Sequence, residues 1–124
     1  MKKHLALFLI AGLLSCHKDE PVTINPDPAL GSVVEATGRL SNYAAIDGCG
    51  ILLTIQKDSV TFNEYAISEK SDSLVKHYLV YERGYADLKA TFQFQHTNRK
   101  KDVQCGWAGF KPFDEVLLLS IKPI

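Results

Sequence analysis

The sequence predicts a mainly-β domain with one short helix, folded as a small barrel of five strands. Hydrophobic and polar residues alternate from Leu88 to Gln95, which is the period of a strand with one buried face. Short segments rich in β-branched residues recur between turn residues, and one apolar stripe with helical spacing interrupts them. The chain has 124 residues, which is enough for one such domain and not for two.

The first three strands are expected over residues 33–41, 49–56 and 60–65. The first is rich in β-branched residues, and the second alternates so that one face can be buried. Residues 41–48 carry Asn, Asp and Gly and are expected to form a loop. A tight polar link at residues 57–59 predicts a hairpin between the second and third strands.

A short helix is expected next. Asp72 or Ser73 can cap its start, and Gly84 stands where a glycine commonly ends a helix. The same stretch also reads as a strand, so the alternative is a sixth strand over residues 74–83. The helical interpretation depends on an apolar stripe of four residues, Leu74, Val75, Tyr78 and Leu79.

The last part of the chain predicts two more strands. The fourth is Leu88–Gln95, and a polar loop is expected at residues 96–102. An aromatic- and glycine-rich connection at residues 104–113 then leads to a very apolar final strand, Val116–Ile121. Three strands, a helix and two strands is the order of an OB-fold, a small Greek-key barrel. An all-β sandwich is the alternative.

The N-terminus has the layout of a secretory signal peptide. Lys2 and Lys3 precede a short apolar run, Leu5–Leu14. The run is shorter than the roughly 20 apolar residues that span a bilayer. Its end at residues 13–16 (Leu-Leu-Ser-Cys) resembles the bacterial lipobox. That resemblance implies removal of residues 1–15 and acylation of the cysteine by chains such as palmitate. The alternative is an ordinary cleaved signal peptide.

Residues 16–32 are therefore expected to form the lipidated Cys16 and a proline-rich tether, and residues 33–124 to form the barrel domain. Lys18-Asp19-Glu20 resembles the surface-export signal of Bacteroidota lipoproteins. The implied location is the outer membrane, either exposed at the cell surface or facing the periplasm. Two or more acyl chains hold a protein stably on a membrane.

The cysteine count also points outside the cytoplasm. Acylation of Cys16 leaves Cys49 and Cys105, which predicts a disulfide in an oxidising compartment. The chain-entropy model gives a loop of this length about 4 kcal/mol of stabilisation. The cysteines and histidines lack metal-ligand spacing, so neither a metal nor a cofactor is expected.

The chain as a whole resembles small Bacteroidota lipoproteins with an OB-like barrel. The resemblance covers most of residues 33–124. It rests on Asp47-Gly48-Cys49-Gly50 before an apolar strand, on the alternating strand at 88–94, and on a second Cys before the strand at 116–121. It implies the fold and the envelope location and brings no activity with it.

The predicted disulfide would pin the two loops that OB-folds commonly use for ligands to one rim. Aromatic faces stack on sugars or bases, and cations bind acidic groups. The alternative is that the aromatic residues plug the barrel while the basic run is a solvated turn. Tyr43, Asp47 and Tyr85 are further candidates. The six candidate rim residues are Trp107, Phe110, Phe113, Arg99, Lys100 and Lys101.

No enzyme motif is present, and 14 basic residues balance 14 acidic ones, so neither catalysis nor nucleic-acid binding is expected. The expected role is a monomeric, membrane-anchored module that binds a protein or glycan partner. The alternatives are an inhibitor of a lysozyme-like hydrolase and a structural accessory. Six other ionisable residues are expected to be solvated: His77, His96, Glu64, Glu69, Asp72 and Glu82.

Overall fold

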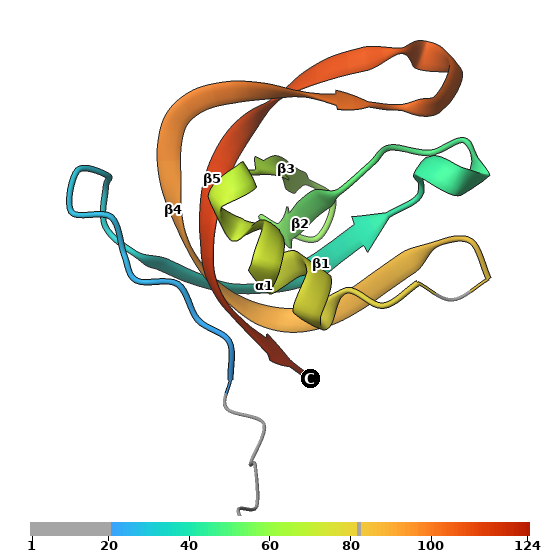
Figure 1. Ribbon diagram of the computed structural model, residues 1–124. Coiled ribbons are helices and arrows are strands. Elements are labelled where there is room, and N and C mark those ends of the chain that lie inside the picture. Colours follow the sequence, from blue (N-terminus) through green and yellow to red (C-terminus); the bar gives the residue numbers. More distant parts are fainter. Residues whose placement is uncertain (1–20, 82) are drawn as a thin grey trace, which may run out of the picture.

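The computed structural model describes residues 21–81 and 83–124. The predicted leader, Cys16 and the export signal lie outside the described residues. Five strands close into a barrel in the order β1-β2-β3-β5-β4 (Figure 1). The elements are β1 (Val34–Asn42), η1 (Ala44–Ile46), β2 (Leu52–Gln56), β3 (Phe62–Ile67), η2 (Glu69–Ser71), α1 (Asp72–Tyr78), β4 (Ala86–Gln104), η3 (Gly106–Ala108) and β5 (Phe110–Pro123).

The pairing of the strands confirms the predicted OB-like barrel. β1 is antiparallel to both β2 and β4, β2 to β3, and β4 to β5. A short parallel pairing of Tyr65–Ile67 in β3 with Asp114–Val116 in β5 completes the ring. The sandwich alternative is wrong, because residues 72–78 form a helix instead of a sixth strand.

The core fills the barrel interior. The alternation predicted for the fourth strand is confirmed: Ala90, Phe92 and Phe94 point into the core and are almost fully buried. α1 lies across the front of the barrel in Figure 1 and contributes Leu74 and Val75 to the same core. The helix therefore covers one end of the barrel.

The predicted helix caps are wrong. α1 begins after Ser71 and ends before Leu79, well short of Gly84. The Ser71 hydroxyl makes no capping bond; it donates to the carbonyl oxygen of Leu118 and accepts from its N–H, both at 2.9 Å. Gly84 instead adopts a φ of +88° in the turn before β4. The buried Ser71 side chain thus ties the helix to β5.

β4 and β5 are much longer than predicted. The expected loop at residues 96–102 belongs to β4 and pairs with β5 around a bulge between His96 and Lys100. The chain reverses only at residues 105–109. Residues 97–102 contribute nothing to the main core, so hydrophobic alternation disappears there although the backbone pairing continues. Backbone pairing with β5 holds this part of β4 in place. Such pairing leaves no alternation of hydrophobic residues in the sequence.

The second half of the predicted tether lies on the barrel. Ile24 N–H donates to the carbonyl oxygen of Leu119 at 2.8 Å. The buried Gln95 side chain accepts from Asp27 N–H and donates to the carbonyl oxygens of Asp27 and Gly31. Val22 also packs against the core. Residues 22–31 are therefore packed on the barrel although they precede the predicted boundary at 33, because this stretch carries apolar residues as well as prolines.

Candidate functional site

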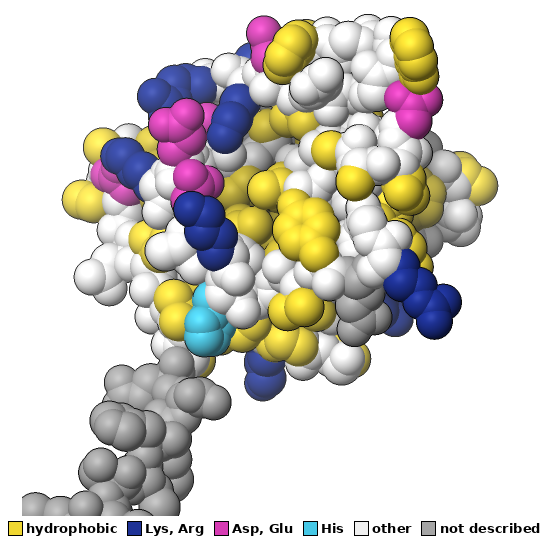
Figure 2. Space-filling view, turned by 45° about the vertical axis from the view of Figure 1, so that its right-hand side comes forward, with side chains coloured by type: hydrophobic (Ala, Val, Ile, Leu, Met, Phe, Trp, Pro, Cys, Tyr) yellow, Lys and Arg dark blue, Asp and Glu magenta, His cyan; other side chains and the backbone are white. Residues whose placement is uncertain are grey.

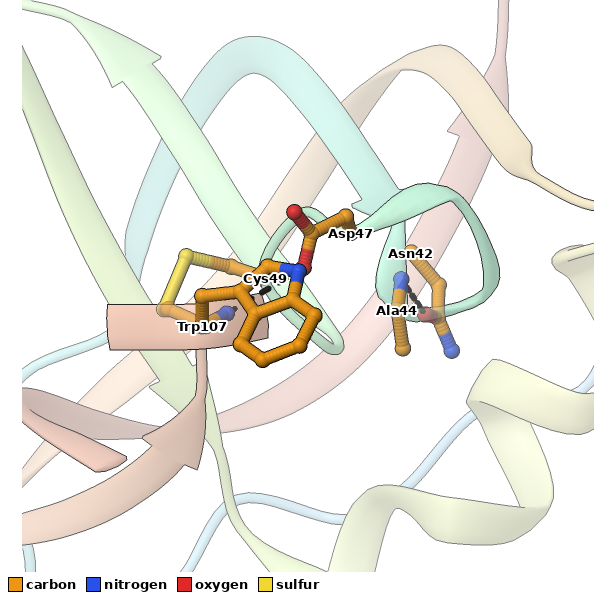
Figure 3. Close-up of a disulfide and its surroundings, with 6 residues drawn as sticks. Asn42, Ala44, Asp47, Cys49 and Trp107 are labelled. Carbon is orange, nitrogen blue, oxygen red and sulfur yellow. Dashed lines mark hydrogen bonds between the residues drawn. A yellow bond between two sulfur atoms is a disulfide. The ribbon is translucent and has the colours of Figure 1, made fainter. Parts of the chain in front are cut away.

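The predicted disulfide joins the β1–β2 connection to the β4–β5 connection. Cys49 and Cys105 are bonded and face each other as an antiparallel bridge between the two loops. Gly50 N–H donates to the carbonyl oxygen of Gln104 at 2.9 Å beside them. Figure 3 shows the bridge next to Trp107. The two loops are therefore held together at one end of the molecule, as the sequence predicts.

A second contact locks the same loops. The Asp47 carboxylate accepts from Trp107 N–H at 3.1 Å (Figure 3). Gly106 has a φ of +53°, and a Cβ there would overlap with the backbone oxygen and the carboxylate of Asp47. Only glycine fits this close approach. On the other loop, the Asn42 side chain accepts from Ala44 N–H at 3.0 Å and helps to shape η1.

Residues 44–49 and 105–110 together form a surface that we call the disulfide tip. Trp107 is 94% exposed and Phe110 is 68% exposed. Ile46, on the facing loop, is 53% exposed. The alternative in which the aromatic residues plug the barrel is therefore wrong for Trp107 and Phe110. Both rings project into solvent near the disulfide, Trp107 from η3 and Phe110 from the start of β5.

Phe113 behaves differently from the other two candidate aromatics. It lies three residues beyond Phe110 on β5, so the two side chains leave the strand on opposite faces. The Phe113 side chain is half-buried and packs with a small second cluster outside the main core. That cluster consists of Leu52, Ala66 and Val103. Phe113 thus helps to hold the hairpin against β2 and β3.

The three cations do not gather with the aromatics at the tip. Arg99 pairs with Glu115 and Lys100 with Asp114, each at 2.9 Å. Lys101 donates to the carbonyl oxygen of Ile67 at 2.8 Å. On the face shown in Figure 2, Lys and Arg side chains lie among Asp and Glu side chains. The basic run is therefore matched by acids and backbone oxygen at the base of the hairpin.

The isolated histidines differ in their surroundings. His77 is exposed on α1, as predicted, whereas His96 is half-buried, with ring centroids 5.3 Å from Tyr65 and 5.7 Å from Phe94. Among the residues that the structure describes, no three His, Cys, Asp or Glu side chains are grouped to hold a metal ion.

The sequence also predicted four solvated acids. Glu64, Glu69 and Asp72 are exposed, and Glu82 is outside the described part.

Tyr43 and Tyr85 form a separate cluster with β1 and β4. Their rings stack with centroids 5.6 Å apart. Tyr43 OH donates to the Asp87 carboxylate at 2.8 Å, and Arg39 donates to the same oxygen at 2.8 Å. The hydrogen bond to Asp87 is the main reason that the pKa of Tyr43 is raised above its usual value. Of the three further candidates, Asp47 is the one that hydrogen-bonds to Trp107.

No protein-family model, curated protein or solved structure matches this chain. In the described ranges, the helices are all too short or too polar to cross a bilayer.

The sequence does hold a signal for the tip. Glycines stand immediately before and two residues after Trp107, at positions 106 and 109, and both adopt positive φ. Such a pair marks a tight reversal, where a large side chain has little surrounding structure to enter. The exposure of Trp107 could have been read from this spacing.

Proposed function

We propose that this chain is a non-catalytic, lipid-anchored protein of the bacterial outer membrane that binds a partner protein through the disulfide tip. The observation that carries the proposal is a tryptophan that is 94% exposed on a cross-linked loop. Exposed apolar patches mark interaction surfaces, and Trp107 shares the tip with exposed Phe110 and Ile46. Tryptophan is also among the residue types enriched at the energetic centres of interfaces.

The rigidity of the tip favours tight binding. The disulfide and the Asp47–Trp107 contact fix both loops before any partner arrives. Association then orders fewer backbone and side-chain torsions, which removes part of the entropic cost of binding. The Trp107 indole itself has only two side-chain torsions to fix.

A glycan is the second partner class expected from the sequence. A sugar site needs polar side chains placed around the aromatic ring. At the tip, the neighbouring Asp47 carboxylate is directed to the Trp107 backbone N–H. Phe110 and Ile46 add apolar surface. This composition favours a protein partner at the tip.

A second candidate function is inhibition of a lysozyme-like hydrolase. A projecting loop braced by a disulfide has the shape to enter an active-site cleft, and residues 105–110 form such a loop. This function requires stoichiometric inhibition of at least one enzyme in a hydrolase panel, abolished by the Trp107→Ala change. The remaining role is that of a structural accessory. In that case the Trp107→Ala change would release no partner.

Replacing Trp107 with Ala is expected to abolish partner capture without unfolding the protein. Because the side chain is almost wholly solvated, its loss should alter the free energy of unfolding by no more than about 0.5 kcal/mol. An interface centre lost on truncation costs about 2 kcal/mol or more, so the Kd should rise by roughly 30-fold. The measurements are chemical denaturation and quantitative co-purification from envelope extracts, followed by titration of the partner that is recovered.

Phe62→Ala is the matched control. Phe62 is 57% exposed at the start of β3, outside the tip. A partner retained by the wild type and by Phe62→Ala, and released by Trp107→Ala, supports the proposal. Equal retention by all three proteins contradicts it, as does unfolding of Trp107→Ala.

The anchor is tested separately by intact mass spectrometry of protein extracted from membranes. We expect a polypeptide that begins at Cys16 and carries a diacylglycerol and, on its amino group, a further acyl chain. The Cys16→Ala variant should stay unmodified and unprocessed. Recovery of unacylated wild-type protein that retains residues 1–15 would contradict the lipid anchor.

A further inference from the structure

A groove of about 500 Å³ runs along the outer surface of the barrel, where the chain leaving α1 meets β1 and β4. It combines aromatic rings with charges of both signs and shares no residue with the disulfide tip. Its main walls are Arg39, Tyr78, Val80, Tyr85, Asp87 and Lys89. We propose that this groove is a saccharide-binding site.

The aromatic wall is held in a fixed orientation. Tyr85 is 40% exposed. Tyr43 stacks against it with an interplanar angle of 18°, and the Tyr43 hydroxyl is itself held by Asp87 at 2.8 Å. An aromatic face carries partial negative charge, which suits the slightly positive C–H groups on one side of a sugar ring. The groove therefore offers a pre-set surface for a pyranose.

The polar wall supplies an acceptor and donors side by side. One oxygen of Asp87 accepts from both Tyr43 and Arg39, while its other oxygen accepts no hydrogen bond from the described residues. Arg39 uses one nitrogen for this pair and has further N–H groups to donate. Vicinal sugar hydroxyls can donate to the carboxylate and accept from the guanidinium at once. Hydrogen bonds to ionised groups are the stronger kind.

The two charged side chains differ in exposure. Asp87 is an exposed residue, but its side chain is 22% exposed against 59% for Arg39. The Asp87 carboxylate is held in place by the Tyr43 hydroxyl and the guanidinium. A ligand that binds here meets side chains already oriented by their own contacts, which lowers the entropic cost of binding.

The same arrangement argues against a bare phosphate, which would meet the Asp87 carboxylate next to the guanidinium and be repelled by it. A saccharide uses both the aromatic face and the donor–acceptor pair. Lys89 adds a further hydrogen-bond donor to the same wall.

The test uses the full chain in detergent, labelled with a fluorophore and applied to an array of defined neutral, N-acetylated and uronic-acid oligosaccharides. The strongest binder is then titrated by calorimetry. We expect Tyr85→Ala and Asp87→Asn each to weaken binding by at least tenfold. Tyr85→Phe should bind like the wild type, because the ring is kept. Trp107→Ala should also bind normally.

Three results would overturn the inference. The first is the absence of binding to every class on the array. The second is binding that survives both Tyr85→Ala and Asp87→Asn. The third is binding lost only with Trp107→Ala, which would assign the sugar to the tip. If Asp87→Asn lowers the unfolding midpoint, its loss of binding is not informative. The Tyr85→Ala variant then tests the saccharide site, because Tyr85 lies at the surface. The first two results say nothing about partner-protein capture, so the groove proposal can fail while the proposed function stands. The third result would also revise the ligand class proposed for the tip.

Discussion

Replacing both Cys49 and Cys105 with Ser should lower the free energy of unfolding by about 4 kcal/mol. The bridge joins residues 56 apart in the sequence, so its removal releases a long loop in the unfolded chain. In the folded chain it joins two connections that otherwise share only a few hydrogen bonds. Guanidinium denaturation without reductant measures the change.

The matched control is the wild type unfolded in excess reductant. Its midpoint should fall to that of the double variant, whereas reductant should leave the variant unaffected. A loss below about 1 kcal/mol would show that the disulfide barely constrains the unfolded chain. The variant should also bind partner protein more weakly, because the tip loses its brace.

Replacing Phe92 with Ala should destabilise the barrel by about 3–5 kcal/mol. Phe92 is fully buried at an inward position of β4 and is among the largest core side chains. Its removal leaves a cavity that the surrounding closed sheet cannot easily collapse to fill. A small domain has only about 5–15 kcal/mol of total stability, so the variant should be substantially unfolded at elevated temperature. Thermal and guanidinium unfolding measure the loss.

Phe110→Ala is the control for Phe92→Ala. Both are phenylalanines on the β4–β5 hairpin, but Phe110 is 68% exposed. Its replacement should change stability by no more than about 0.5 kcal/mol. Equal losses for the two variants would contradict the assignment of Phe92 to the core and Phe110 to the surface.

The fold could be predicted for the segments in which one face is buried and the other is exposed. Leu88–Gln95 alternates because the barrel interior excludes water on one side of β4. Beyond His96 the strand continues through partners such as Asp114, which pairs with Lys100 across the hairpin. No local sequence pattern indicates such a pairing, so residues 96–102 were predicted to be a polar loop.

The site was predictable to a similar degree. Counting cysteines was enough to pair Cys49 with Cys105, because a predicted lipidation removes the third. The groove was not predictable, since Arg39 and Asp87 meet only when β1 and β4 close the barrel in register. Sequence separation hides that closure. Tyr43 and Tyr85 were both candidate residues, but the contacts of Asp87 with Tyr43 and Arg39 could not be read from the sequence.

The docking of residues 22–31 on the barrel sets the reach of the protein. With Cys16 acylated as proposed, the stretch up to Val22 can extend at most about 20 Å. If the Ile24–Leu119 hydrogen bond and the hydrogen bonds of Gln95 broke, the chain would be free up to β1. The tether would then be longer by about 40 Å. A single barrel could then work either close against the bilayer or well clear of it, with its strands unchanged.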